Sequence, residues 1–316
     1  MTTTLEPART VVPDAPARVR QGLSERLAPY AYIAPFFVIF AVFGLVPLLF
    51  TFYVALFDWN PIGEHVFIGL DNFTRLAGDT RFWNAAWNTV SIWLLSTVPQ
   101  LLVALGLAHL LNHARLRFAV FLRMSMVVPY ITSVAATTIV FAQMFDRDYG
   151  LLNWLLGLVG VAPTDFLQSV WGSHLMIAVM VTWRWFGYTT LLYLASLQAI
   201  PRAIYEAAAV DGAGPWKQFR HISVPSLRPV IVFTIVTSTI GGLQIFTEPL
   251  LISRAAPLTC GPVRQCQTLT LFLYEQGFGQ FQFGYGSAIG VALFVLIIAI
   301  ATLNYVLSTR IRPERS

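Results

Sequence analysis

The residues best able to act on a solute lie in one apolar stretch, Thr-Trp-Arg-Trp-Phe-Gly-Tyr. Arg184 is the charge in it, and Trp183, Trp185 and Tyr188 are its aromatic neighbours. A charge within an apolar span marks a functional site by default, because burying it there is costly. A guanidinium group donates several hydrogen bonds in a fixed fork, and aromatic faces can cover the C–H surfaces of a sugar. The pattern therefore favours binding of an uncharged, hydroxyl-rich solute.

Gln244 and Glu248, one helical turn apart, are the other polar candidates for a solute pathway. Pro249 would break the helix and expose carbonyl groups, which a membrane tolerates only at a cavity or a protein contact. A purely structural alternative is also open. In it, Arg184 pairs with Glu248 or with a carbonyl group, and the tryptophans pack against neighbouring helices.

Motifs for catalysis are absent from the sequence. The single lysine, Lys217, follows Trp216, so no phosphate-binding loop ending in Gly-Lys exists. No HExxH, GxSxG or CxxC pattern occurs, and the five histidines are scattered. We therefore expect no catalytic residue, no metal site, no bound cofactor and no enzymatic activity in this chain.

The two cysteines, Cys260 and Cys266, lie close together in the sequence. The spacer between them, which contains Gly261 and Pro262, permits a disulfide in an oxidising compartment. Two free thiols are the alternative.

Composition indicates which solvent surrounds these residues. The 316 residues are 56% hydrophobic and 11% charged, with a mean hydropathy of +0.66. A soluble domain carries about 25% charged residues, so lipid must surround much of this chain. The net charge of +5 could suggest a nucleic-acid partner, but the basic residues lie between apolar runs, so none is expected.

Charge-poor windows long enough to cross a bilayer core of ~30 Å predict six helices. The apolar runs are continuous, which excludes a sheet, and helices satisfy their own backbone amides. The predicted fold class is all-α, a polytopic membrane helical bundle, with a disordered arm at 1–29 and a tail at 310–316. The expected spans are 30–57, 84–111, 121–145, 170–198, 229–252 and 286–309.

Arginine and lysine in the connections predict the orientation. Fourteen of them fall in the two termini and in the connections after the second and fourth spans, and five fall in the opposite connections. This asymmetry predicts a multi-pass protein of the plasma membrane with both termini in the cytoplasm.

A polar segment between the fourth and fifth spans, residues 199–228, is punctuated by proline and glycine. Pro201 suits the first turn of a helix, and Gly212 is placed to end that helix in a left-handed cap. Pro215 can start a second short helix, which Pro225 stops before the fifth span. We call this predicted cytoplasmic helix–turn–helix the elbow. Its flat run of alanines suits either docking to another protein or packing on the chain's own loops.

The elbow resembles the EAA loop of the permease subunits of binding-protein-dependent ABC importers. That family's pattern is Glu-Ala-Ala, three residues, Gly, nine residues and Ile-x-Leu-Pro, and here Val224 stands where Leu is usual. The matching positions are Glu206, Ala207, Ala208, Gly212, Ile222 and Pro225, and Asp211 and Ala213 complete the common Asp-Gly-Ala. The stretches 33–59, 88–112 and 184–201 are similar to the carbohydrate branch, the first permease subunit of maltose, lactose and cellobiose importers.

The resemblance implies a permease subunit with the type I ABC importer fold, which moves a di- or oligosaccharide into a bacterial cytoplasm. In that family the loop is a coupling helix seated in a cleft of an ATPase, so the eight matching residues would transmit ATP-driven closure. The implied partners are a second permease in a heterodimer, two ATPase subunits that hold ATP and Mg²⁺, and an extracellular or periplasmic solute-binding protein. That protein would meet the outer connections 58–83, 146–169 and 253–285.

Two other functions remain open. An ABC permease for glycerol-phosphate, an amino acid or an ion would share the elbow, although a phosphate cargo would need several pathway arginines. An ion-coupled secondary transporter would need titratable residues in several spans and an inverted repeat, and the sequence offers little beyond Arg184.

Overall fold

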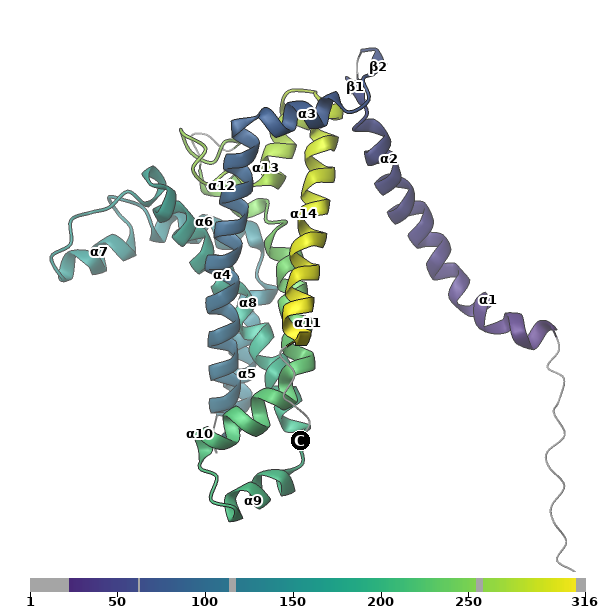
Figure 1. Cartoon of the computed structure of the whole chain (residues 1–316). Coiled ribbons are helices and arrows are strands. Elements are labelled where there is room, and N and C mark those ends of the chain that lie inside the picture. The colour runs from purple at the N-terminus through teal and green to yellow at the C-terminus, as the bar shows by residue number, and fades with distance from the viewer. Residues whose placement is uncertain (1–22, 62, 114–117, 254–257, 311–316) are drawn as a thin grey trace, which may run out of the picture. The chain divides into compact units, whose positions relative to one another are not determined.

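The computed structural model in Figure 1 describes residues 23–61, 63–113, 118–253 and 258–310. The chain separates into two units, residues 1–50 and 51–316. The described part of the first unit is helical: α1 (Leu23–Phe40) runs through a π turn, η1 (Ala41–Leu45), into α2 (Val46–Val54), whose last four residues belong to the second unit. Its large apolar side chains, such as Phe43, are exposed, as a lipid surrounding requires.

The predicted arm, residues 1–29, extends too far toward the first span, because residues 23–29 are helical. Helix α1 begins at Leu23, because Leu, Glu, Arg and Ala are good helix formers that extend the apolar helix backwards. The rest of the predicted arm, residues 1–22, lies outside the described residues, as does most of the predicted tail.

The second unit is a bundle of long helices with short elements at both ends. A two-stranded antiparallel hairpin and a short helix come first: β1 (Phe57–Trp59), β2 (His65–Phe67) and α3 (Asp71–Gly78). The long helices are α4 (Thr80–His113), α5 (Ala119–Ile131), α6 (Val134–Met144), α8 (Val170–Gln198), α11 (Val224–Gly242) and α14 (Phe283–Arg310). The connecting elements are α7 (Leu151–Leu158), η2 (Phe166–Gln168), α9 (Arg202–Val210), α10 (Pro215–Gln218), η3 (Phe219–Ser223), α12 (Thr247–Ile252), α13 (Leu269–Tyr274) and η4 (Glu275–Gly279).

Five helical segments of the described chain are long and apolar enough to cross a membrane, and a bent pair, α5 with α6, makes a sixth. The all-α membrane-bundle fold class is thus confirmed. The five segments are Tyr30–Val54, Thr80–Asn112, Val170–Gln198, Pro215–Gly242 and Phe283–Ser308.

The third expected span, 121–145, is not one rod. Helices α5 and α6 meet at 95°, and of the two residues between them Thr132 has an extended backbone and Ser133 a non-helical one. Pro129 lacks an amide for the last turn of α5, and the hydroxyl of Thr132 donates to the carbonyl of Val128 at 2.7 Å. That carbonyl also accepts the amide of Thr132 at 3.2 Å, and a hydroxyl that shares a helix carbonyl in this way often bends the helix.

The fifth expected span, 229–252, differs at both ends. One continuous helical segment runs from Pro215 to Gly242, so Pro225 does not stop the helix. The amide of Val224 reaches back five residues to Phe219 in the π turn η3, and this wider turn makes room for the ring of Pro225 in the next turn. Beyond Gly242 the chain leaves the helix, and α12 is a separate short element.

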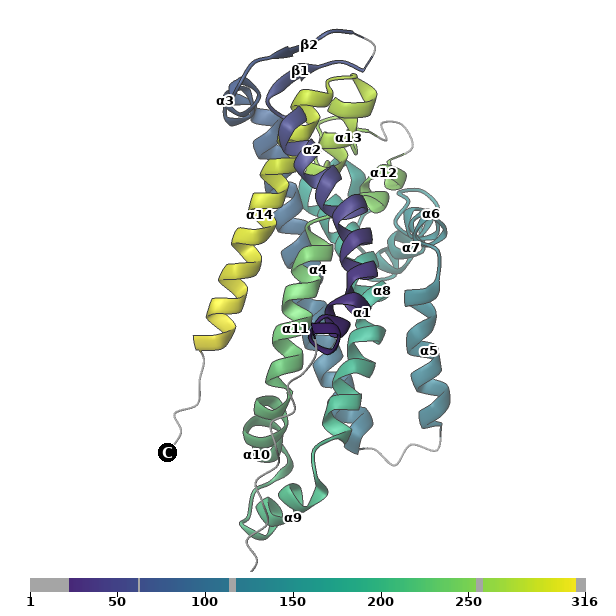
Figure 2. The ribbon, with the colours of Figure 1, turned by 90° about the vertical axis from the view of Figure 1, so that its right-hand side faces the viewer.

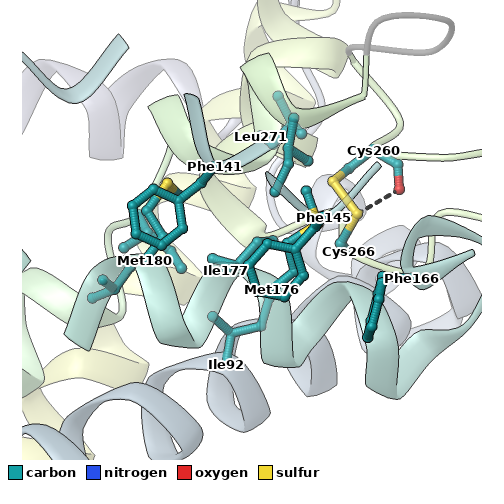
Figure 3. Close-up of a cluster of buried hydrophobic side chains, with 13 residues drawn as sticks. Ile92, Phe141, Phe145, Phe166, Met176, Ile177, Met180, Cys260, Cys266 and Leu271 are labelled. Atoms are coloured by element: carbon teal, nitrogen blue, oxygen red, sulfur yellow. Dashed lines mark hydrogen bonds between the residues drawn. A yellow bond between two sulfur atoms is a disulfide. The ribbon is translucent and has the colours of Figure 1, made fainter. Parts of the chain in front are cut away.

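Helices α4, α8 and α11 run together through the bundle (Figures 1 and 2). Small residues of α4, such as Ala104 and Ala108, are fully buried against Tyr193 of α8 and Leu227 of α11. A second apolar cluster joins α6 to α8, where Phe141 and Phe145 meet Met176 and Met180 (Figure 3).

The close crossing of α5 against α8 depends on Gly187, because a Cβ there would overlap the carbonyl oxygen of Met126. We expect Gly187→Ala to force the helices apart at a cost of about 1–3 kcal/mol. The melting temperature of the purified protein in detergent should fall by several degrees. Gly106→Ala in α4, where a Cβ would meet no atom within 4 Å, is the control and should leave it unchanged or raise it. Equal melting temperatures for both variants would contradict the crossing.

Candidate functional site

A cavity of about 170 Å³ lies between α4, α5, α8 and α11. One part of its wall is aromatic: Tyr130 of α5 and Tyr188 of α8 stack with their ring centres 5.0 Å apart. Trp185 meets Tyr130 edge-on at 5.2 Å. The bend between α5 and α6 follows Tyr130 directly, so this ring lies where the third span changes direction.

The rest of the wall carries uncharged polar groups. Gln100 of α4 donates from Nε2 to the hydroxyl of Thr189 in α8 at 3.0 Å, which ties the two helices together beside the cavity. Hydroxyl groups of α11 continue this surface. The polar lining residues are Thr97, Gln100, Tyr130, Trp185, Tyr188, Thr189, Thr234, Thr237 and Ser238, and no Asp, Glu, Lys or Arg is among the described residues that line it.

Two of the six residues predicted for the solute pathway, Trp185 and Tyr188, line this cavity. Trp183 lies on another side of α8, 37% exposed, with its ring 5.4 Å from that of Phe141. Gln244 is exposed in the segment between α11 and α12.

Arg184 and Glu248 also lie outside the lining. Arg184 Nη1 is 3.8 Å from Glu248 Oε1, and their side chains are 14% and 9% exposed. This geometry matches the structural alternative, in which the arginine pairs with Glu248. A buried charge with a partner costs far less than an isolated one, so the pair removes both charges from the solute's surroundings.

Most of the polar lining was not foreseen from the sequence. Thr189, Thr234 and Thr237 each donate to a backbone carbonyl within one turn of their own helix, as hydroxyl residues in apolar helices commonly do. Nothing in their spacing distinguishes such residues from those that face a cavity. Only the packing of α4 against α8 and α11 reveals which of them do.

A loop that crosses one end of the bundle, residues 258–268, is fastened to the helices by polar contacts. Cys260 and Cys266 form a disulfide within it, beside the apolar cluster of Figure 3. Asn88 of α4 donates to the carbonyls of Arg264 and Gln267 at 2.9 and 3.1 Å. These contacts satisfy carbonyl groups that the irregular backbone leaves open.

The same loop is joined to the cavity. His174 of α8 hydrogen-bonds through Nε2 to the carbonyl of Gln265 at 2.8 Å and through Nδ1 to the hydroxyl of Ser91 at 2.9 Å. The Thr268 hydroxyl donates to the carbonyl of Ile245 at 3.0 Å. Because Ile245 lines the cavity, the loop supports one residue of the cavity wall.

An ion pair between Arg264 of the loop and Glu275 of η4 also holds the loop in place. Arg264 donates from Nη2 to Glu275 Oε1 at 2.8 Å, and Gln267 donates to Glu275 Oε2 at 2.7 Å. Burial by itself would raise the pKa of Glu275, but these hydrogen bonds and the charge of Arg264 hold that pKa below its ordinary value of 4.5.

The elbow lies at the opposite end of the bundle (Figure 1). Helix α9 ends in a Schellman motif: the amide of Gly212 donates to Ala209 at 3.1 Å, and that of Ala213 to Ala208 at 2.8 Å. Gly212 has φ +78°, the left-handed conformation that the sequence predicts for it. Asp211 is the residue that caps the helix.

The bend of the elbow is held by side chains. Gln218 of α10 donates from Nε2 to the carbonyl of Ala213 at 2.9 Å, and the hydroxyl groups of Tyr205 and Ser223 are 2.9 Å apart. Phe219 packs on His109 of α4 with ring centres 4.4 Å apart. The two short helices are thus fixed to each other and to the bundle.

The surface of α9 is left open, since no side chain of it is buried by the part of the chain that the structure describes. Glu206 and Ala207 are exposed and Ala208 is half-buried. Val210 is 89% exposed and Trp216 of α10 is 72% exposed. Ile222 is half-buried and Pro225 exposed on the helix that follows.

The fold and this elbow define a membrane transport subunit. Residues 81–313 match the family described as "Binding-protein-dependent transport system inner membrane component", and the chain belongs to this family. It is therefore an integral inner-membrane permease with the type I ABC importer fold.

Similar proteins extend over nearly the whole chain. The arabinooligosaccharides permease AraP of Bacillus subtilis is 33% identical over 92% of this chain and 91% of its own length. The lactose permease LacF of Rhizobium radiobacter is 35% identical over 87% and 91%, and the trehalose/maltose permease MalF of Thermococcus litoralis is 31% identical over 90% and 94%. A crystal structure of a bacterial ABC transporter that imports alginate has a chain of the same fold, with a TM-score of 0.77, 20% identity, and coverage of 92% of this chain and 98% of that one.

The ion pair in the loop predicts an acid-sensitive contribution to stability. Because the pKa of Glu275 is below 4.5 in the folded protein, its charge stabilises the fold above that pH, and the stabilisation is lost as the pH falls below it. We expect Glu275→Gln to melt at a lower temperature than wild type at pH 7, and the gap to shrink below pH 4.5. A gap that is the same at both pH values would contradict the assignment.

Proposed function

We propose that this chain is the permease subunit of an ATP-driven importer that moves a di- or oligosaccharide into the cytoplasm. The observation that carries the proposal is the continuous helical segment from Pro215 to Gly242, 28 residues long. At ~1.5 Å per residue it spans about 42 Å. It starts in the elbow and ends beside the cavity, where Thr237 and Ser238 form part of the wall.

This continuity gives the elbow a mechanical role. The segment is helical throughout, with one π turn, and Gln218 and Tyr205 fix α9 to its beginning. A force on α9 would therefore move the cavity wall rather than deform a loop. The open, small-residue surface of α9 fits the surface of another protein, and Ala207, Ala208 and Glu206 would form the centre of that contact.

The partner of the elbow in this proposal is a separate ATPase, present in two copies, which holds ATP and Mg²⁺. Arginine asymmetry supports a cytoplasmic position for the elbow and both termini. A second permease would complete the pathway as a heterodimer, with the aromatic and hydroxyl wall of this chain as one side of it. One crystal structure of the alginate transporter contains a sugar-loaded periplasmic protein, which supports an extracellular or periplasmic binding protein as the donor of solute.

An uncharged sugar is the solute that the cavity fits best. Its lining offers hydroxyl, amide, phenol and indole groups but no charge among the described residues. A phosphate or carboxylate there would lose its hydration without gaining a counter-charge. Relatives named for arabinooligosaccharides, lactose and trehalose/maltose support the same class.

The aromatic wall predicts a sharp difference between two neighbouring tryptophans. Trp185→Ala removes a ring from the cavity, so uptake of the sugar by membrane vesicles should fall severalfold with normal amounts of protein in the membrane. The matched control is Trp183→Ala, whose ring packs on Phe141 outside the cavity, and its uptake should stay near wild type. Equal losses in both variants would contradict the position of the pathway.

The elbow predicts a difference between two neighbouring glycines. Gly212 has φ +78°, so Gly212→Ala strains the Schellman turn by about 1–2 kcal/mol and should lower both uptake and solute-stimulated ATP hydrolysis severalfold. Gly214 has φ −65°, which alanine adopts freely, so Gly214→Ala should behave as wild type. Both positions have no atom within 4 Å of an added Cβ, so the pair separates backbone strain from crowding. Normal uptake in Gly212→Ala would contradict a coupling role for the elbow.

A further inference from the structure

Helix α7 has the reverse of the pattern expected of a water-exposed helix, which buries apolar residues and exposes polar ones. Its one buried residue is polar, Asn153, whereas its exposed positions are apolar. Trp154 is 62% and Leu158 66% exposed. The exposed apolar side chains on and directly after the helix are Leu151, Trp154, Leu155, Leu158, Val159 and Val161.

The shape of this segment is fixed from within. Asn153 donates from Nδ2 to the carbonyls of Asp146 and Thr164 at 3.0 and 2.9 Å, and its Oδ1 accepts from the amide of Thr164 at 3.0 Å. Leu152 and Leu156 pack on the apolar cluster that contains Phe145 and Phe166. The apolar surface is therefore held facing outward, where it does not pack on the apolar cluster of the bundle.

Its position in the bundle indicates a membrane boundary. The segment joins α6 to the membrane span that starts at Val170, and Figure 1 shows α7 projecting sideways from the bundle, in the half away from α9. Eight residues extend only about 12 Å, too short to cross a bilayer core of ~30 Å. Trp171, at the first turn of that span, is also exposed, and tryptophan gathers where membrane meets water.

We propose that α7 lies in the bilayer interface on the side opposite the elbow and binds lipid through its Leu and Trp side chains. Polar flanks at Asp146, Asp148 and Asp165 would keep both ends of the segment at the water boundary. The polar side chain of α7, that of Asn153, is used internally, so its outward face has none of the polar rim that a transient protein interface carries. Lipid needs no such rim, and burial of this face in it removes apolar surface from water at ~25 cal/mol per Å². The anchor would fix α6, whose end it joins, at its 95° angle to α5.

The experiment uses the assembled transporter in lipid nanodiscs. The chain has two cysteines, both in the disulfide, so a new cysteine is the single free thiol of this chain and can be labelled with an environment-sensitive fluorophore. Leu158→Cys and Trp154→Cys probe the apolar face, and Asp148→Cys, exposed in the polar flank, is the matched control. Quenching by nitroxides on lipid acyl chains is compared with quenching by iodide in water.

Labels at 158 and 154 should be quenched severalfold more by lipid nitroxides than the label at 148, and severalfold less by iodide. Iodide quenching at 158 and 154 equal to that at 148 would overturn the proposal, because the face would then lie in water. Protection of both labels from both quenchers would also overturn it, because a protein partner would then cover the face. Transport is not measured, so the outcome is independent of the proposed function.

Discussion

Lipid leaves no water to satisfy a peptide group, and this one constraint decides where the chain can leave a helix. At two described breaks in the long helices, side chains donate hydrogen bonds to backbone carbonyls. At the bend of α5 and α6 the hydroxyl of Thr132 donates to the carbonyl of Val128, and after α11 the carbonyl of Ile245 accepts from the hydroxyl of Thr268. The irregular loop 258–268 is satisfied in the same way by Asn88 and His174. Polar side chains that hydrogen-bond to the backbone at these breaks are therefore not free to bind a solute. Only the other polar side chains of the bundle can face one.

These hydrogen-bonded breaks divide the described chain into rigid helical segments that are joined at defined positions. The helical segment from Pro215 to Gly242 connects the exposed elbow with the cavity wall. At the other end, the loop with the disulfide is joined to the cavity through Ile245. The cavity wall is thus continuous with the helical segment of the elbow on one side and hydrogen-bonded to the loop with the disulfide on the other. Such an arrangement suits a pathway that opens to one side of a membrane at a time.

The sequence predicted well where one residue dictates local geometry. Gly212 was expected to close α9 in a left-handed cap, and the Schellman bonds are there. Span 170–198 has the expected bounds, since no proline or glycine pair interrupts it. Prediction failed where two local rules compete: Pro225 reads as a helix stop, but the π turn before it lets the helix continue. The solute site was predicted least well. The intramembrane charge of Arg184 indicates a functional site in the sequence, but in the structure this residue pairs with Glu248. Gln100 and Thr189, which border the cavity, resemble ordinary residues of an apolar helix.

In the proposed function, the elbow is a rigid joint whose open surface is covered by a separate ATPase. Hydrogen exchange of the backbone amides of residues 202–213 tests it most directly, in the permease complex with and without the ATPase. In the absence of that partner these amides should exchange faster than those of the buried helix α8, because no side chain of α9 is buried. Strong added protection of this segment on ATPase binding is the predicted result. Unchanged exchange there, with the ATPase bound elsewhere on the complex, would contradict the account.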